Sequence, residues 1–115
     1  MHVVDEALSI IDASRGSVTI ESVAKRVGIT RRHLERRFRE YVGLGAKQIA
    51  RIARIHSALE LLQAQPEMSG AEIAVTCGYS DQAHLIRECQ QFAGQTPQRL
   101  KTTDQSLAGL MREAV

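Results

Sequence analysis

Arginines dominate residues 29–43, and they are the side chains in this stretch best suited to recognise another molecule. The stretch holds five arginines and two glutamates. An arginine guanidinium can donate two parallel hydrogen bonds to a guanine or a phosphate, which lysine cannot do. The net charge of +2 hides a segregation, because residues 25–54 hold ten Lys or Arg against two acids, and the rest of the chain holds five against eleven. This basic segment predicts an acidic partner such as a nucleic-acid groove.

A helix following Thr30 would position these arginines. Its apolar residues recur at i, i+4, i+7 and i+8 and form one stripe, made of Leu34, Phe38, Tyr41 and Val42. Arg32 and Arg36 lie nearly opposite that stripe at about 100° per residue. Thr30 can cap the helix and Gly43 can end it. A single helix of this kind is also compatible with an ordinary solvated basic face.

The rest of the chain is predicted to be helical, which gives an all-α fold of about seven helices. With 43% hydrophobic and only 3% aromatic residues, the core must be mostly aliphatic. Besides the arginine-rich helix, periodicity and capping residues predict helices over residues 3–14, 20–27, 46–64, 70–77 and 81–93, with Ser80 capping the last of these, and a short helix after Thr96-Pro97. The helix over 46–64 would span roughly 28 Å. Residues 102–115 form a polar link and then a marginal or frayed helix.

Several functional classes lack support in the sequence. No apolar run approaches the roughly 20 residues of a membrane span, so we expect no membrane partner. The two cysteines suggest a reduced, cytoplasmic protein. Gly43 and Gly45 stand without the rest of a phosphate-binding loop, and no nucleophile–base pair is evident. Cys77, His84 and Cys89 make no recognised zinc spacing. We therefore expect no catalytic site, no metal and no cofactor.

An internal repeat strengthens the case for recognition of nucleic acid. Gly28 and Gly78 serve as anchors, and around them Val23-Ala24 matches Ile73-Ala74, while Ile29-Thr30 matches Tyr79-Ser80. Anchored on Leu34 and Leu85, Arg36 matches Arg87, Phe38 matches Cys89 and Gly43 matches Gly94. Equivalent residues of the two copies are 50 positions apart before the turn and 51 positions apart after it.

The repeat predicts two helix-turn-helix subdomains, whose second helices would each enter a major groove. The first subdomain would be residues 1–44, the linker helix residues 45–65 and the second subdomain residues 66–101, followed by the tail 102–115. Successive major grooves on one face of B-DNA lie about 34 Å apart, so a linker helix of about 28 Å is of the right order.

The pattern resembles the AraC/XylS family of bacterial transcription regulators over about residues 3–101. The residues that carry the resemblance are Leu34, Arg36, Phe38, Gly43, Arg54, Ala58, Leu61, Leu62, Ile73, Ala74, Gly78-Tyr79-Ser80-Asp81-Gln82, His84-Leu85, Arg87 and Gly94-Gln95-Thr96-Pro97. Three positions depart from the family pattern. Cys89 stands where the family usually has phenylalanine, and Leu100-Lys101 stand where it often has tyrosine followed by arginine. Gly45 replaces the usual small polar residue followed by proline.

The resemblance implies a function as well as a fold. The partner would be double-stranded promoter or operator DNA, with RNA polymerase as a second partner, in the bacterial cytoplasm at the nucleoid. Family members usually also carry an effector-binding or dimerisation domain. The chain of 115 residues has no room for one, so it would be a stand-alone small regulator or a DNA-binding domain whose effector domain is missing here.

Candidate contact residues follow from the helix faces. In the first subdomain, Arg32 and Arg36 are predicted to contact base edges, Glu35 to accept from cytosine N4, and Arg31, Arg37 and Arg39 to contact phosphates or remain solvated. In the second, Gln82, Ala83, His84 and Arg87 lie on the exposed face or leading end, with Ala83 able to touch a thymine methyl. Thr30 and Ser80 are predicted to present helix amides to phosphate.

Two questions stay open at this level. The second subdomain is less basic, with Asp81 and Glu88 nearby, so the first should dominate affinity. Arg54 could serve an internal salt bridge as well as a DNA contact. The competing function is a helical protein-interaction module, because a basic face also suits an acidic protein.

Overall fold

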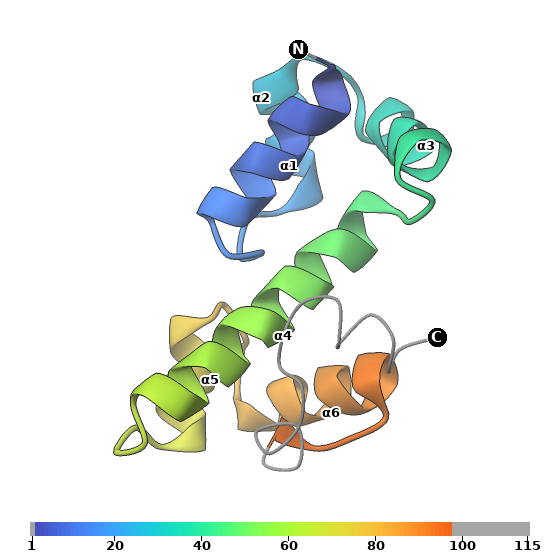
Figure 1. The fold of residues 1–115 in the computed structure, drawn as a ribbon. Coiled ribbons are helices and arrows are strands. Elements are labelled where there is room, and N and C mark those ends of the chain that lie inside the picture. Colours follow the sequence, from blue (N-terminus) through green and yellow to red (C-terminus); the bar gives the residue numbers. More distant parts are fainter. Residues whose placement is uncertain (1, 98–115) are drawn as a thin grey trace. The chain divides into compact units, whose positions relative to one another are not determined.

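All regular structure between residues 2 and 97 is α-helical (Figure 1). The structure is a computed structural model, and it describes residues 2–97. Its helices are α1 (Val3–Ala13), α2 (Ile20–Val27), α3 (Arg31–Tyr41), α4 (Ala46–Ala64), α5 (Gly70–Thr76) and α6 (Gln82–Ala93). The all-α prediction is therefore confirmed. Beyond Pro97, the predicted short last helix and the predicted tail lie outside the described residues. No helix within 2–97 combines the length and apolar character needed to cross a membrane.

The chain divides into two units between Arg51 and Ile52. The first unit holds α1, α2, α3 and the start of α4, and the second holds the rest of α4 with α5 and α6. Each unit thus contains one of the two predicted helix-turn-helix motifs. The finer division into residues 1–44, 45–65 and 66–101 stays a prediction.

In the first unit, α1, α2 and α3 pack on one another around an aliphatic core. Its fully or nearly fully buried side chains from these helices are Val4, Ala7, Ile11, Ile20, Val23, Ala24, Leu34 and Phe38. The apolar stripe predicted for α3 is right for its first half only. Tyr41 and Val42 are 57% and 37% exposed. The phenol ring of Tyr41 stacks on the imidazole of His2 at the surface, with centroids 4.3 Å apart.

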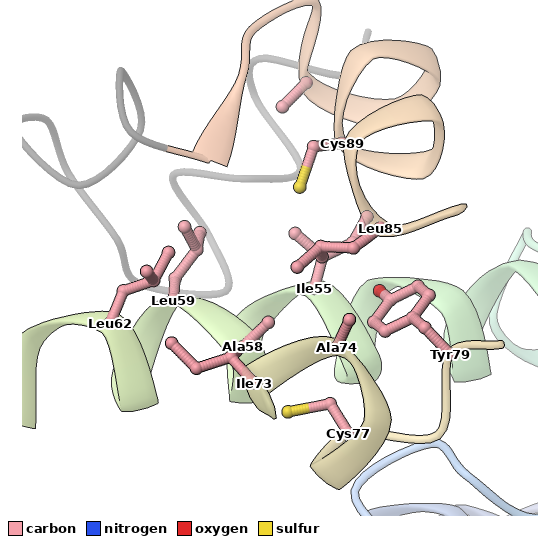
Figure 2. Packing of buried hydrophobic residues seen from close by; sticks show 11 residues of the cluster. Ile55, Ala58, Leu59, Leu62, Ile73, Ala74, Cys77, Tyr79, Leu85 and Cys89 are labelled. Carbon is pink, nitrogen blue, oxygen red and sulfur yellow. The ribbon is translucent and has the colours of Figure 1, made fainter. Parts of the chain in front are cut away.

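The core of the second unit is formed by α4, α5 and α6, and Figure 2 shows their side chains converging. Its buried members are Ile55, Ala58, Leu59, Leu62, Ile73, Ala74, Cys77, Tyr79, Leu85, Cys89 and Ala93. Both cysteines are free and buried, and they pack as small core residues.

The glycine of the turn and the hydrogen bond across it are the same in both units, as the repeat predicted. Gly28 and Gly78 have φ angles of 81° and 91°, a left-handed conformation that glycine adopts without steric cost. The amide of Ile29 donates to the carbonyl of Ala24 at 3.1 Å, and the amide of Tyr79 donates to the carbonyl of Ala74 at 2.9 Å. These bonds satisfy carbonyls at the ends of α2 and α5 and direct the chain into the next helix.

The start of α6 differs from the prediction. Ser80 was expected to cap this helix, but the N-cap is Asp81, whose carboxylate accepts from the amide of His84 at 2.8 Å. In the first unit Thr30 caps α3 and accepts from the amide of His33 at 3.1 Å, as predicted. Thr30 and Asp81 stand 51 residues apart, so Ser80 is the extra residue of the second turn. Serine and aspartate cap helices about equally well, so residue type alone could not distinguish Ser80 from Asp81.

Candidate nucleic-acid interface

Two arginines of α3 are exposed and uncommitted. Arg32 and Arg36 lie one turn apart on the face opposite the buried Leu34 and Phe38. Considering residues 2–97, neither guanidinium has a hydrogen-bond or ion-pair partner within the protein. Arginine is bulky and always charged. Two exposed guanidinium groups on one face of α3 therefore indicate an acidic partner outside the protein. These are the two side chains predicted to contact base edges.

The other three arginines of α3 have neighbours within the first unit. Arg31 forms an ion pair with Glu21 of α2. The Nε atom of Arg37 donates to Nε2 of His33 at 3.3 Å, and its Nη1 atom lies 3.8 Å from the carboxylate of Glu40. Such exposed pairs contribute at most about 1 kcal/mol, so a phosphate can replace them.

Arg39 is exposed and its guanidinium lies beside Gly45. A Cβ atom at residue 45 would stand 3.3 Å from the Nη2 atom of Arg39. The absence of a side chain at Gly45 therefore leaves room for Arg39 next to the start of α4. This position keeps the charge at the surface, where a phosphate contact is geometrically open.

Glu35 is placed differently from its arginine neighbours. It is half-buried, and its Oε2 atom accepts from the amide of Ala46 at 3.1 Å. This carboxylate therefore caps the first turn of α4, a contact that sequence reasoning missed. The available signal was Gly45, which begins α4 without the small polar side chain that usually caps a helix.

In the second unit the exposed candidates are Ser80, Gln82, Ala83 and Arg87. Over the described part of the chain, no hydrogen bond or ion pair occupies the guanidinium of Arg87. Gln82 lies across Gly70 in the first turn of α5, where any Cβ atom would collide with the Gln82 amide. Arg87 is therefore the clearest counterpart of an uncommitted arginine of α3.

His84 is held by the turn that precedes its helix. Its ring meets the ring of Tyr79 edge-on with centroids 5.1 Å apart, and its Nδ1 atom lies 3.4 Å from the hydroxyl of Ser80. The imidazole is half-buried, and its Nε2 atom is 3.9 Å from the carboxylate of Glu88. These contacts hold the ring against the protein, with both ring nitrogens close to protein groups.

A buried ion pair joins α4 and α6 beneath this surface. The Nη2 atom of Arg54 donates to both carboxylate oxygens of Glu88, at 2.9 and 3.2 Å, and Glu88 is 3% exposed. The choice left open for Arg54 is thus resolved toward an internal salt bridge. Glu88 was expected near the contact residues of the second subdomain, but its carboxylate is buried and bonded to Arg54. Burial and the neighbouring Glu88 carboxylate also raise the pKa of Tyr79.

The candidate residues therefore form one group in each unit. The first group, on α3 and its cap, contains Thr30, Arg31, Arg32, Glu35, Arg36, Arg37 and Arg39. The second group, at the start and outer face of α6, contains Ser80, Gln82, Ala83, His84 and Arg87. The first group carries five guanidinium groups and the second carries one.

Known sequences support the helix-turn-helix assignment. A family described as a helix-turn-helix domain matches residues 23–103. The HTH-type transcriptional regulator GlxA of Rhizobium meliloti is 38% identical over 80 residues, which are 70% of this chain and 24% of that protein. The chain thus spans about a quarter of the length of this relative.

Solved structures agree with that match. A transcriptional regulator from Chromobacterium violaceum, with an AraC-type DNA-binding domain, superposes with a TM-score of 0.75 and 29% identity, covering 86% of this chain and 88% of that one. The C-terminal domain of the response regulator AraT from Geobacillus stearothermophilus superposes with a TM-score of 0.78 and 25% identity. The match covers 90% of this chain and 87% of that one. With a family match over most of its length and these neighbours, the chain belongs to the AraC/XylS family of transcriptional regulators, as their DNA-binding domain.

Proposed function

We propose that the chain binds duplex DNA in a sequence-specific manner by placing α3 and α6, its two recognition helices, in major grooves, and that it regulates transcription in this way. The observation that carries the proposal is the duplicated turn. Both units have the same glycine turn and the same hydrogen bond across it, and each leads to a helix with an exposed arginine at the equivalent position, Arg36 or Arg87.

In the first unit, Arg32 and Arg36 are proposed to contact base edges. An arginine fork matches O6 and N7 of guanine, which is the commonest specific contact in the major groove. Arg31, Arg37 and Arg39 are proposed to contact phosphates, which fix the register of the protein on the duplex. The hydroxyl of Thr30 caps α3, and the remaining free amides at this helix start suit a phosphate oxygen.

In the second unit, Arg87 is proposed to contact a guanine and Ala83 to touch a thymine methyl. Gln82 can donate to a base edge only by moving away from Gly70, and His84 only by giving up its contact with Ser80 or Glu88. Ser80 stands one residue before the N-cap, where its hydroxyl suits a phosphate contact better than a base contact. We therefore propose that the second unit distinguishes fewer bases than the first.

The wider assignments rest on the family. We propose that residues 1–101 act as the DNA-binding domain and that RNA polymerase is a second partner at the promoter. Because GlxA is about four times as long as the matched segment, an effector-binding domain belonging to the same regulator is part of this proposal.

A salt titration tests the DNA proposal. The protein first selects its preferred duplex from a random-sequence pool, and the Kd for that duplex and for a scrambled one is then measured at several salt concentrations. Three phosphate contacts predict a slope of log K against log salt of roughly −3 or steeper. Preferred DNA should bind at least about a thousandfold more tightly than scrambled DNA.

The same titration tests the competing function, a helical module that binds an acidic protein. That function predicts no enrichment of any sequence from the pool and equal affinity for both duplexes. Such a result would contradict the proposed function, even if the protein binds DNA weakly through its basic surface.

A further inference from the structure

Glu35 is an acid on the most basic helix of the chain, and its carboxylate points back into the protein. Its Oε2 atom accepts the amide hydrogen of Ala46 at 3.1 Å. A Cβ atom at Gly45 would stand 2.8 Å from that same oxygen, so a side chain at residue 45 would require the carboxylate to move. The carboxylate therefore occupies the space that a capping side chain at residue 45 would otherwise fill.

The start of α4 needs such a partner. The first amides of a helix have no carbonyl within the helix, and the helix dipole favours negative charge there. Gln48 accepts from the amide of Gly45 at 3.1 Å, but Gly45 has no side chain to bond the following amides. Glu35 supplies the missing acceptor from a different helix, so the bond joins α3 to α4 as well as capping α4.

We propose that Glu35 is a positioning residue, which fixes the recognition helix α3 against the first turn of α4 so that Arg32 and Arg36 meet the bases correctly. This inference rests on the proposed function of α3. Leu34 and Phe38 hold α3 by apolar packing, which has little directional preference. A charge-assisted hydrogen bond is directional, and it opposes a rotation or a slide of the helix. Binding groups must be held to within about 0.5 Å of their productive position.

The role differs from the contact with cytosine N4 that the sequence suggested for Glu35. A base contact would require the carboxylate to leave Ala46 and turn outward, which would leave the start of α4 without this acceptor. It would also affect recognition at one base pair. A positioning role instead affects every base that α3 contacts.

Electrostatics predicts the direction in which DNA affinity should change if Glu35 has no positioning role. Removing an acid from a helix that faces DNA should by itself strengthen binding, because phosphates repel carboxylates. Glu40→Ala is the matched control: Glu40 lies on the same helix, is exposed, and contacts Arg37 and not α4. We expect Glu40→Ala to bind preferred DNA up to a few times more tightly and Glu35→Ala to bind it about tenfold more weakly.

The base preferences of the variants identify the cause. Binding is measured on a library of single base-pair changes in the preferred duplex. Glu35→Ala should flatten the preference at all positions that Arg32 and Arg36 distinguish, while the positions that depend on Arg87 keep theirs. Glu35→Gln retains an oxygen that can accept from Ala46, and it should bind at least as tightly as the wild type.

A second variant separates positioning from capping. In Glu35→Ala/Gly45→Ser, the serine side chain caps α4, but nothing joins α4 to α3 at this point. Its thermal midpoint should return toward that of the wild type while its DNA affinity stays about tenfold low. Because this variant restores the cap, it decides the matter even if Glu35→Ala folds poorly.

Three outcomes would overturn the proposal. In the first, Glu35→Ala tightens binding as Glu40→Ala does. In the second, its loss of preference is confined to one C·G pair, which would establish a base contact. In the third, DNA affinity recovers together with the thermal midpoint in the double variant, so that Glu35 serves α4 alone. None of these outcomes would affect the salt dependence of the wild type, which tests the proposed function separately.

Discussion

The two units share a turn but use their charged side chains differently. In the first unit, Arg32 and Arg36 are exposed on α3 without a partner among residues 2–97. In the second unit, the partly buried Arg54 of α4 forms an ion pair with the buried Glu88 of α6. Charge therefore faces outward in one copy and serves partly as internal structure in the other.

The difference shows how one motif can be adapted to two tasks. The glycine turn and the small alanine before it set the geometry of both copies. The side chains outside that frame are free to vary, and they determine how strongly each helix attracts phosphate and how many bases it distinguishes. We therefore expect the first unit to supply most of the affinity and the second to depend more on its own internal network.

The largest expected effect concerns the equivalent core positions Phe38 and Cys89, both fully buried. Phe38→Ala removes a large ring and should lower the free energy of unfolding by about 3–5 kcal/mol, while Cys89→Ala should cost about 1 kcal/mol. Urea unfolding of the two variants measures both values. If both variants lost the same free energy of unfolding, Phe38 and Cys89 would not be the equivalent core positions that the repeat implies.

The next comparison is between a buried and an exposed ion pair. Glu88→Ala removes the carboxylate that Arg54 contacts in a buried setting and should cost roughly 3 kcal/mol of unfolding free energy. Glu21→Ala removes the exposed partner of Arg31 and should cost less than about 1 kcal/mol. Thermal or urea unfolding distinguishes them. A loss of similar size in both would mean that Glu88 contributes no more than a surface charge.

A smaller effect is expected for the equivalent arginines when DNA binding is measured. Arg36→Ala should lose about 1–3 kcal/mol of binding free energy on preferred DNA and relax the base preference locally. Arg87→Ala should lose less, because fewer neighbouring cations support it. A larger loss for Arg87→Ala would reverse the proposed ranking of the two units.

The smallest effect is a pH dependence confined to the second unit, which holds both cysteines. Burial raises the pKa of the Cys89 thiol from 9.0 to about 12. Above pH 9 the unfolded chain has lost this proton while the folded chain keeps it, so stability falls as the pH rises. Between pH 9 and 10 the loss should be on the order of 1 kcal/mol. Cys89→Ala should lose less stability over that range, and an identical decline would exclude this thiol as its source.

Local sequence signals predicted much of the fold because they act over a few residues. Gly28 and Gly43 each follow the end of a helix, and the backbone of each has a positive φ. Glycine is the usual residue where a helix ends in this conformation. Ser69 and Glu72 form a capping box at the start of α5, a signal contained within four residues. The bounds predicted for α4 agree with Ala46–Ala64, because no glycine or proline interrupts that segment.

What the sequence could not provide depends on distant neighbours. Ser80 and Asp81 are adjacent and cap helices about equally well, so the sequence alone did not distinguish them, and the N-cap is Asp81. The Glu35–Ala46 bond joins residues 11 apart, and the Arg54–Glu88 bond joins residues 34 apart. Periodicity assigns a residue to a face of its own helix, but it does not show which neighbouring helix meets that face. The same limit explains why Tyr41 was expected in the core.

Methylation interference at guanine N7 tests most directly whether both helices enter a major groove through their exposed arginines, Arg32 and Arg36 on α3 and Arg87 on α6. On the preferred duplex, N7 methylation should inhibit binding at two separate groups of guanines, with stronger inhibition at the group contacted by α3. Arg36→Ala should weaken sensitivity at the α3 group alone, because Arg32 remains there, and Arg87→Ala should abolish it at the other group alone. Binding that is insensitive to N7 methylation, or two variants that lose sensitivity at the same guanines, would contradict the account.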